Sequence, residues 1–409
     1  MVGTQEFDLI IVGGGLVGAS LACALGNSTL RIAVVESIPP GDPGQPSYDD
    51  RTIALAYSSR RIFETIGVWQ PIVDRSVNPI EHIHISDRGH FGITRLHAAD
   101  LGIEALGYVV ETRALGLALY ESMQRFSNIE LLCPYEVKTF DQKDGEANLE
   151  LSGPQGSRNC AARLIVLADG GRSPLRDQFH MKVEKKAYDQ VAVVANVTPG
   201  VNHNNTAYER FTAEGPLALL PITQDRCAVV WSTQPDKADE VLAWSDAEYL
   251  ANLQKRFGNR LGQFSRAGTR QKYPLAMTKV KDPVRERLVL IGNAAHTVHP
   301  VAGQGFNLGL RDVASLAQLL VDADRSTQDI GSLALLNEYV GWRESDNRRT
   351  TMFTDGLINI FSNDFLPMAV GRNLGLMAVD LFPSVKRAFM RRTSGLTGKL
   401  PRLARGLPL

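Results

Sequence analysis

The stretch FDLIIVGGGLVG, residues 7–18, decides the fold. Residues 7–13 form a largely apolar run, as expected for a parallel strand that is covered on both faces. Gly13, Gly15 and Gly18 then follow in the pattern G-x-G-x-x-G, and residues 19–25 have the small side chains of a closely packed helix. A second strand over 31–35 ends at Glu36. Strand, glycine turn, helix and strand therefore come in the order of a dinucleotide-binding unit.

Each glycine of this turn has its own task. Gly13 permits the tight turn, Gly15 lets the backbone approach a pyrophosphate, and Gly18 lets the helix pack closely on the strand. The phosphates are expected at the helix N-terminus, among free N–H groups. Glu36 is placed to accept hydrogen bonds from both hydroxyls of an adenosine ribose, which argues against a 2′-phosphate at this site. The motif alone does not separate NAD from FAD.

Two later segments favour FAD. Residues 163–168 (RLIVLA) predict a strand, and Asp169-Gly170 follows it, although an ordinary strand-to-helix loop has the same pattern. A further strand ends at Gly292-Asn293, before small residues and a helix whose N-terminus would stabilise the anionic edge of a reduced flavin. Pro300, Gly303, Gln304, Gly305 and Asn307 lead into that helix.

The three segments together resemble the FAD-dependent aromatic hydroxylases typified by p-hydroxybenzoate hydroxylase, as far as about residue 310. The resemblance implies that Asp169 lies near the FAD pyrophosphate and that Asn293 bonds the ribityl chain, where the family usually has Asp. It also implies that Arg113 and Arg51 contact the cofactor and that the segment from Pro300 to Asn307 lines the isoalloxazine ring. An amide in place of the carboxylate weakens one hydrogen bond by about 1 kcal/mol, so FAD binding should persist.

The fold expected from these patterns is α/β: a Rossmann-like FAD-binding domain with an inserted β-sheet substrate domain and a C-terminal helical segment. Strand-like, β-branched runs between the second and third segments supply the inserted sheet. A second G-x-G-x-x-G unit is absent from the sequence, so NADH or NADPH is expected as a transient co-substrate. The expected ranges are 1–80, 101–178 and 284–345 for the FAD-binding domain, 81–100 and 179–283 for the substrate domain, and 346–409 for a helical, basic tail.

Within that family, four stretches resemble the ubiquinone-biosynthesis hydroxylases: residues 49–56 (DDRTIALA), 83–92 (IHISDRGHFG), 292–312 (GNAAHTVHPVAGQGFNLGLRD) and 372–383 (RNLGLMAVDLFP). The likeness is greatest to members that act on 2-polyprenyl-6-methoxyphenol. It implies that NAD(P)H reduces FAD, that O2 adds at flavin C4a to give a hydroperoxide, and that the phenol ring is hydroxylated para to its hydroxyl. No residue of the sequence identifies itself as the base that activates the phenol. A flavin-dependent prenyl reductase and a non-catalytic prenyl-binding protein on the same scaffold stay open as alternatives.

The composition of the chain limits the partners, the metal content and the cellular location that we expect. The formal net charge is zero, so no overall field recruits nucleic acid. The four cysteines form no CxxC pair and the first residues resemble no signal peptide, so a cytoplasmic protein with reduced thiols is expected. No metal is expected, because His82 and His84 fit two histidines on one face of a strand. His296 fits a packing and hydrogen-bonding role better than that of a general base.

The end of the chain is basic, because no acidic residue follows Asp380. Apolar helical segments precede these cations. Such a tail fits the anionic surface of the inner membrane, another ubiquinone-biosynthesis protein, or solvent. The basic residues are Lys386, Arg387, Arg391, Arg392, Lys399, Arg402 and Arg405.

Overall fold

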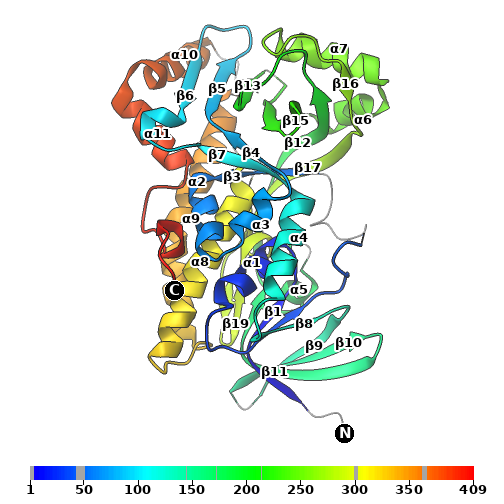
Figure 1. The fold of residues 1–409 in the computed structure, drawn as a ribbon, viewed down its shortest axis with the longest axis vertical. Coiled ribbons are helices and arrows are strands. Elements are labelled where there is room, and N and C mark those ends of the chain that lie inside the picture. Colours follow the sequence, from blue (N-terminus) through cyan, green and yellow to red (C-terminus); the bar gives the residue numbers. More distant parts are fainter. Residues whose placement is uncertain are drawn as a thin grey trace.

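The computed structural model describes residues 4–42, 51–143, 145–171, 173–212, 214–298, 303–361 and 366–409. It confirms the predicted α/β architecture. A parallel sheet with helices forms one half of the molecule, and a large, mainly antiparallel sheet forms the other (Figure 1). No helix in these ranges combines the length and the hydropathy needed to cross a bilayer.

The parallel sheet is built around β1, which contains the apolar run before the glycine turn. β1 pairs in parallel with β2 and β11, and β19 extends the sheet beyond β11. The four residues of β2 and the three of β19 are all buried, because helices cover the sheet. In spatial order the strands are β18 (Val284–Arg285), β19 (Leu288–Leu290), β11 (Gly156–Leu167), β1 (Gln5–Val12), β2 (Ile32–Val35) and β8 (Ile129–Leu132), with β10 (Glu146–Gly153) and β9 (Glu136–Lys143) continuing from β11.

The second sheet contains the runs expected to form the inserted sheet, and β5 and β6 from residues 82–97 also belong to it. β5 pairs in parallel with β13, and β6 lies at the edge. One face of the sheet packs on α6 and α7 through alternating apolar residues of β12, β14 and β15. The spatial order is β20 (His296–Thr297), β17 (Gln271–Val280), β12 (Val183–Thr198), β15 (Arg226–Thr233), β14 (Leu217–Ile222), β13 (Thr206–Phe211), β5 (His82–Asp87) and β6 (Ile93–His97), with β16 (Arg266–Ala267) beside β12.

A small sheet of β3 (Thr52–Ala56), β7 (Gly107–Glu111) and β4 (Val77–Ile80) lies between the two large sheets (Figure 1). Helix α1 contacts both α4 and α8 over the parallel sheet, where the largest apolar cluster lies. The helices are α1 (Leu16–Leu25), α2 (Tyr57–Thr65), α3 (Trp69–Val73), α4 (Thr112–Met123), α5 (Pro174–Gln178), α6 (Pro235–Ala243), α7 (Asp246–Phe257), α8 (Gln304–Arg325), α9 (Leu333–Phe361), α10 (Leu366–Leu381) and α11 (Pro383–Thr393), with short 3-10 helices η2 (Ala98–Leu101), η3 (Gly292–Ala294) and η5 (Leu403–Arg405).

The basic tail is helical as expected, but its last residues pack against the body of the protein. Leu403 and Ala404 are buried in the same apolar cluster as α1 and α8. Lys399 lies over the ring of Trp342, and Arg402 forms an ion pair with Asp322. The tail is therefore divided: its end completes the core, and the exposed cations that precede this end lie on α11.

Two of the stretches that resemble ubiquinone-biosynthesis hydroxylases contact each other, although about 280 residues separate them in sequence. Asp87, at the end of β5, accepts hydrogen bonds from Arg372 Nε at 2.7 Å and from Asn373 Nδ2 at 3.0 Å. Asn373 Oδ1 accepts a hydrogen bond from Gly92 N at 2.6 Å. All three side chains are buried. These bonds fix α10 against the β5–β6 hairpin (Figure 1).

Candidate cofactor and substrate site

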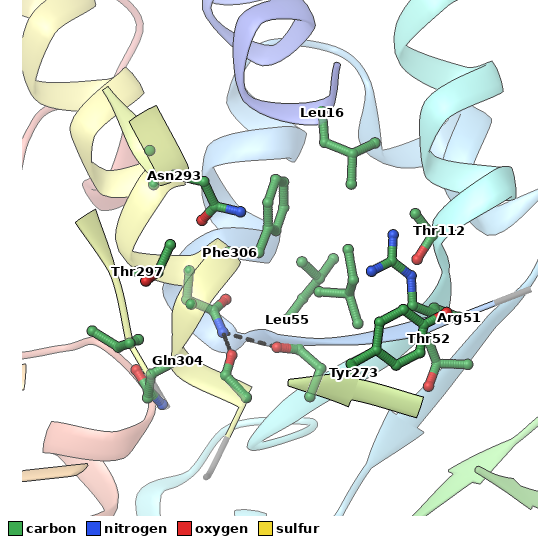
Figure 2. A pocket seen from close by; sticks show the side chains of 18 of the residues that line it. Leu16, Arg51, Thr52, Leu55, Thr112, Tyr273, Asn293, Thr297, Gln304 and Phe306 are labelled. Carbon is green, nitrogen blue, oxygen red and sulfur yellow. Dashed lines mark hydrogen bonds between the residues drawn. The ribbon is translucent and has the colours of Figure 1, made fainter. Parts of the chain in front are cut away.

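A cavity of about 1390 Å³ separates the parallel sheet from the second sheet. The glycine turn, the Asp169 loop, the Asn293 turn and the start of α8 line one side, and the open face of the second sheet lines the other. Small-molecule sites usually span about 300–1,000 Å³, so this cavity has room for a large ligand or for two ligands together. Side chains from distant segments point into a common space, among them Arg51, Tyr273 and Asn293 (Figure 2).

The glycine turn has the geometry that a pyrophosphate needs. Gly13 has a φ of +102°, and a Cβ on it would lie 2.7 Å from the carbonyl oxygen of Ala168. No side chain caps the first turn of α1 at Gly15, so its N–H groups stay available to a ligand. Gly18 is buried behind the turn, and a Cβ there would lie 1.9 Å from the carbonyl oxygen of Gly13. A side chain at this position would therefore force the start of α1 away from the turn that follows β1.

Glu36 follows β2 and lines the cavity beside the turn. Its Oε2 accepts a hydrogen bond from Gly14 N at 2.8 Å, and its Oε1 accepts one from Ile38 N at 2.9 Å. Two backbone donors thus hold the carboxylate at the end of the strand. Ser37 Oγ also donates to Oε1 at 3.5 Å, but Oε2 has a further lone pair, so a ribose hydroxyl could still donate to it.

The second predicted segment brings Asp169 and Gly170 to the cavity directly after β11. Asp169 Oδ1 is buried and has no hydrogen-bond partner among the described residues. Burial raises the pKa of this carboxyl above its ordinary value. A buried acceptor without a donor is costly, and the hydroxyl of a bound ligand would satisfy it.

The third segment forms a turn and a helix N-terminus. Gly292 has a φ of +57°, Asn293 is exposed to the cavity, and Gly303, with a φ of +62°, precedes the first turn of α8. Gln304 and Gly305 of that turn line the cavity as expected, and no side chain caps the helix. Its dipole and free N–H groups therefore point to a place where partial negative charge would be stabilised. Pro300 lies outside the described residues.

Asn307 also lines the cavity, but its side chain is fully occupied by the protein. Its Oδ1 accepts hydrogen bonds from Ala56 N at 2.8 Å and Ser59 Oγ at 2.7 Å. Its Nδ2 donates to Ala54 O at 2.8 Å and Gly303 O at 2.7 Å. The amide thus has no capacity left for a ligand. Asn307 holds β3 and the start of α8 in place, so any contact with a flavin is through its apolar surface.

The two predicted arginines lie in different surroundings. Arg51 precedes β3 and lines the cavity, and its guanidinium lies 4.9 Å from the centre of the Tyr273 ring. Arg113 is exposed on α4 and is not part of the lining, whereas its neighbour Thr112 is (Figure 2). Its contact with a cofactor stays a prediction. Tyr273, Phe306 and Leu55 also line the cavity, and no motif marks them in the sequence.

A buried charged network lies beneath the Asn293 turn, and no local sequence pattern indicates it. Asp312 of α8 accepts a hydrogen bond from Gly292 N at 3.0 Å and one from Arg343 Nε at 2.7 Å, and His296 Nε2 lies 2.7 Å from its Oδ2. Burial opposes the charge of Asp312, but His296 and Arg343 together hold its pKa well below the ordinary value. His296 thus has the hydrogen-bonding role that its position suggested.

Comparison with known proteins decides the family. Residues 6–354 match the family described as "FAD binding domain". The ubiquinone hydroxylase UbiL of Rhodospirillum rubrum is 39% identical over 406 residues, which cover 98% of this chain and 93% of that protein. The chain belongs to the FAD-dependent ubiquinone-biosynthesis hydroxylases. The 3-demethoxyubiquinol 3-hydroxylase of Escherichia coli is 30% identical over 395 residues, which cover 96% of this hydroxylase and 99% of that one.

Solved structures agree on the fold. The p-nitrophenol 4-monooxygenase PnpA of Pseudomonas putida has a TM-score of 0.80 at 21% identity, over 97% of this hydroxylase and 100% of that chain. The hydroxylase is therefore an FAD-dependent monooxygenase that uses NAD(P)H and O2, as expected from the sequence. The glycine cradle, the unpartnered oxygen of Asp169 and the uncapped α8 fit FAD.

Proposed function

We propose that the hydroxylase acts on the ring of a prenylated phenol, 2-polyprenyl-6-methoxyphenol, in ubiquinone biosynthesis. The observation that carries the proposal is the cavity, whose wall opposite the FAD loops is almost wholly apolar. That wall includes Ile83, Leu96, Ala218, Leu220 and Val230. An apolar wall suits a greasy ring and its isoprenoid chain. The name of the R. rubrum relative supports the pathway, and that of the E. coli relative makes 3-demethoxyubiquinol the competing substrate.

Bound FAD, once reduced by NAD(P)H, would supply the activated oxygen atom, and the residues of the chain would position the reactants. The N–H groups at the start of α1 would hold the pyrophosphate, Glu36 the adenosine ribose, and Asp169 and Asn293 the hydroxyl-bearing chain between them. The start of α8 would stabilise negative charge on the flavin ring. The apolar wall would keep water from the reacting atoms.

Purified protein loaded with FAD should consume O2 and NAD(P)H and convert the one-isoprene analogue of 2-polyprenyl-6-methoxyphenol into a product heavier by one oxygen atom. Product mass and oxygen uptake measure this result. The corresponding analogue of 3-demethoxyubiquinol is the control substrate, and faster conversion of it would reassign the substrate within the pathway. Turnover without oxygen uptake would identify a prenyl reductase instead. A colourless protein that cannot be reconstituted with FAD would favour a prenyl-binding role.

We also infer that an apolar face of α10 and α11 docks on an anionic membrane. Val370, Leu374, Met377 and Leu381 recur at helical spacing on α10, and their side chains are 37–66% exposed. Phe382 and Val385 are exposed beside them. We call these six residues the α10–α11 face.

Two observations support the proposal that a membrane is the occupant. Arg387 and Arg391 are exposed on α11, so cations flank the apolar residues as anionic headgroups require. The opposite side of α10 supplies Leu376 and Val379 to the cavity, and α11 supplies Phe389. Helices α10 and α11 lie at the outside of the molecule beside the β5–β6 hairpin (Figure 1), and they also supply side chains to the cavity. A lipid-soluble phenol could enter from the bilayer beside them without crossing bulk water.

Replacing Leu374, Leu381 and Phe382 together with serine should weaken binding to vesicles of anionic phospholipid by more than tenfold. Each side chain forfeits roughly 1.5–3 kcal/mol if it is fully inserted. Co-sedimentation measures binding, and FAD content verifies the fold. The control replaces Val73, Val201 and Leu333, which are 41–52% exposed elsewhere, and should bind as the parent does. Equal binding by both variants, or a parent that forms dimers through this face and ignores vesicles, contradicts the membrane role.

A further inference from the structure

Among the described residues that line the cavity, one carboxylate comes from the second sheet. Side chains alternate between the two faces of each strand, and the face away from α6 and α7 borders the cavity. Along β13 this places Ala207, Glu209 and Phe211 toward the cavity. The neighbours of Glu209 in register are Ile85 of β5 and Ala218 of β14, and both also line the cavity. Among the described lining residues, this sheet offers no second acid.

Glu209 is surrounded by apolar groups and is not paired. Among the described residues no hydrogen bond or ion pair reaches its carboxylate. Its side chain keeps part of its surface accessible, and the cavity is what it borders. Burial raises its pKa from 4.5 to about 7. An unpaired carboxylate in such a setting costs stability, so a structural role does not account for it.

Among the described residues, no charged group on the surrounding elements pairs with Glu209. Arg210, the next residue of β13, bonds to Ser86 Oγ and to the carbonyl oxygen of Arg256 on the opposite face. Leu376 and Val379 of α10, with Phe389 and Thr393 of α11, line the cavity and carry no charge. The charged lining residues Glu36, Arg51, Glu136 and Asp169 all come from outside the second sheet.

We propose that Glu209 is the general base that activates the phenol, an assignment that rests on the proposed function. The phenol O–H bond breaks, its electron pair stays on the oxygen, and the proton moves to a carboxylate oxygen of Glu209. The phenolate directs electron density to the para carbon, which receives one atom of O2, while NAD(P)H provides the electrons that reduce the other atom to water. The proton on that carbon leaves to solvent, and Glu209 returns its proton to the phenol oxygen.

The environment of Glu209 suits this task. A phenol has a pKa of about 10, and a carboxyl at its ordinary pKa near 4.3 would be too weak a base. Burial raises the pKa of Glu209 to about 7. The pKa of the base is then closer to that of the phenol, so proton transfer costs less. The ionised form is present above that pH, so the rate should rise with pH through about 7 in the parent enzyme.

Glu209→Gln keeps the shape of the side chain and removes the base. With the one-isoprene methoxyphenol as probe, kcat should fall roughly 100-fold, the lower range for a lost general base, and its rise with pH through neutrality should disappear. Glu209→Asp should restore part of the rate. Under anaerobic conditions, oxidised parent enzyme should shift the ultraviolet spectrum of the bound probe toward phenolate, and the Gln variant should not. Glu184→Gln, on an exposed part of β12, should behave as the parent does.

Folding and function are separable in this test. The Gln variant should retain FAD and should melt at a higher temperature than the parent above pH 7, because it no longer buries a charge, and at a similar temperature near pH 4. If the parent hydroxylates the probe and Glu209→Gln keeps kcat within threefold with an unchanged pH profile, Glu209 is not the base. If the parent neither binds nor hydroxylates the probe, the phenol substrate itself is wrong, and the assignment of Glu209 is overturned with it.

Discussion

Replacing Gly18 with alanine should give a protein that no longer retains FAD. The new Cβ would lie 1.9 Å from the carbonyl oxygen of Gly13 and 3.1 Å from Ile11 Cγ2. The first of these contacts is backbone, so α1 must move away from β1 to relieve it. That movement displaces the N–H groups that would hold the pyrophosphate. We expect at least a 100-fold loss of FAD affinity, corresponding to about 2.7 kcal/mol, measured by flavin fluorescence titration.

The matched control is Gly341→Ala. Gly341 is an exposed residue of α9 that has no atom within 4 Å of an added Cβ. Alanine there should bind FAD as the parent does and should raise stability by up to about 1 kcal/mol, because alanine favours a helix over glycine. FAD binding by Gly18→Ala that is within threefold of the parent value would show that the close packing of α1 on β1 is not required.

The cofactor half of the site was predictable because its signals are local. The spacing of Gly13, Gly15 and Gly18 reports a turn, and the position of Glu36 after a buried strand reports the end of that strand. The roles of Asp169 and Asn293 came from the family resemblance, and each residue lies within three positions of the end of a strand of the parallel sheet. The carboxyl ends of parallel strands meet at one edge, so residues in these places converge.

Roles that depend on tertiary contacts were harder to predict. Asn307 was expected to line a flavin. All the hydrogen bonds that its amide can form are made with the protein, to β3, Ser59 and Gly303. A side chain in a glycine-rich segment looks the same in sequence whether its partner is a ligand or a strand 250 residues away. The basic tail posed a similar problem. Its composition predicted a surface segment, whereas Leu403 and Ala404 complete the core.

The position of Glu209 at the cavity depends on the register of the sheet. The residues around Glu209, YERF, form no recognisable motif, and the local sequence does not show which face of the strand borders a cavity. Only the pairing of β13 with β5 and β14 places Glu209 beside Ile85 and Ala218. The contact of Asp87 with Arg372 is likewise non-local, although resemblance had singled out both stretches. Neither contact could be derived from spacing, because both join elements far apart in the chain.

Replacing Asp312 with alanine should destabilise the hydroxylase by roughly 3–5 kcal/mol, the usual cost of removing one partner from a buried ion pair. Asp312 is fully buried and bonds to Arg343, to Gly292 N and to His296. Arg343 is 4% exposed and forms ion pairs with Asp312 and Asp346. Without Asp312, its buried guanidinium keeps only the pair with Asp346 among the described residues. The Gly292 turn is released as well, so FAD should dissociate more readily. Urea unfolding of the FAD-loaded protein measures the change.

The pH dependence gives a second test, because the pKa of Asp312 is lowered in the folded protein. A carboxyl with a depressed pKa stabilises the fold above its unfolded value near 3.9, and this contribution is lost as the pH falls toward the folded value. Asp312→Asn should therefore be destabilised at pH 7, and its deficit should shrink below about pH 4. Asp239→Ala removes an exposed pair with Lys272 and should cost at most about 1 kcal/mol. An alanine variant at 312 that is no less stable than this control would mean that the buried network does not support the cofactor turn.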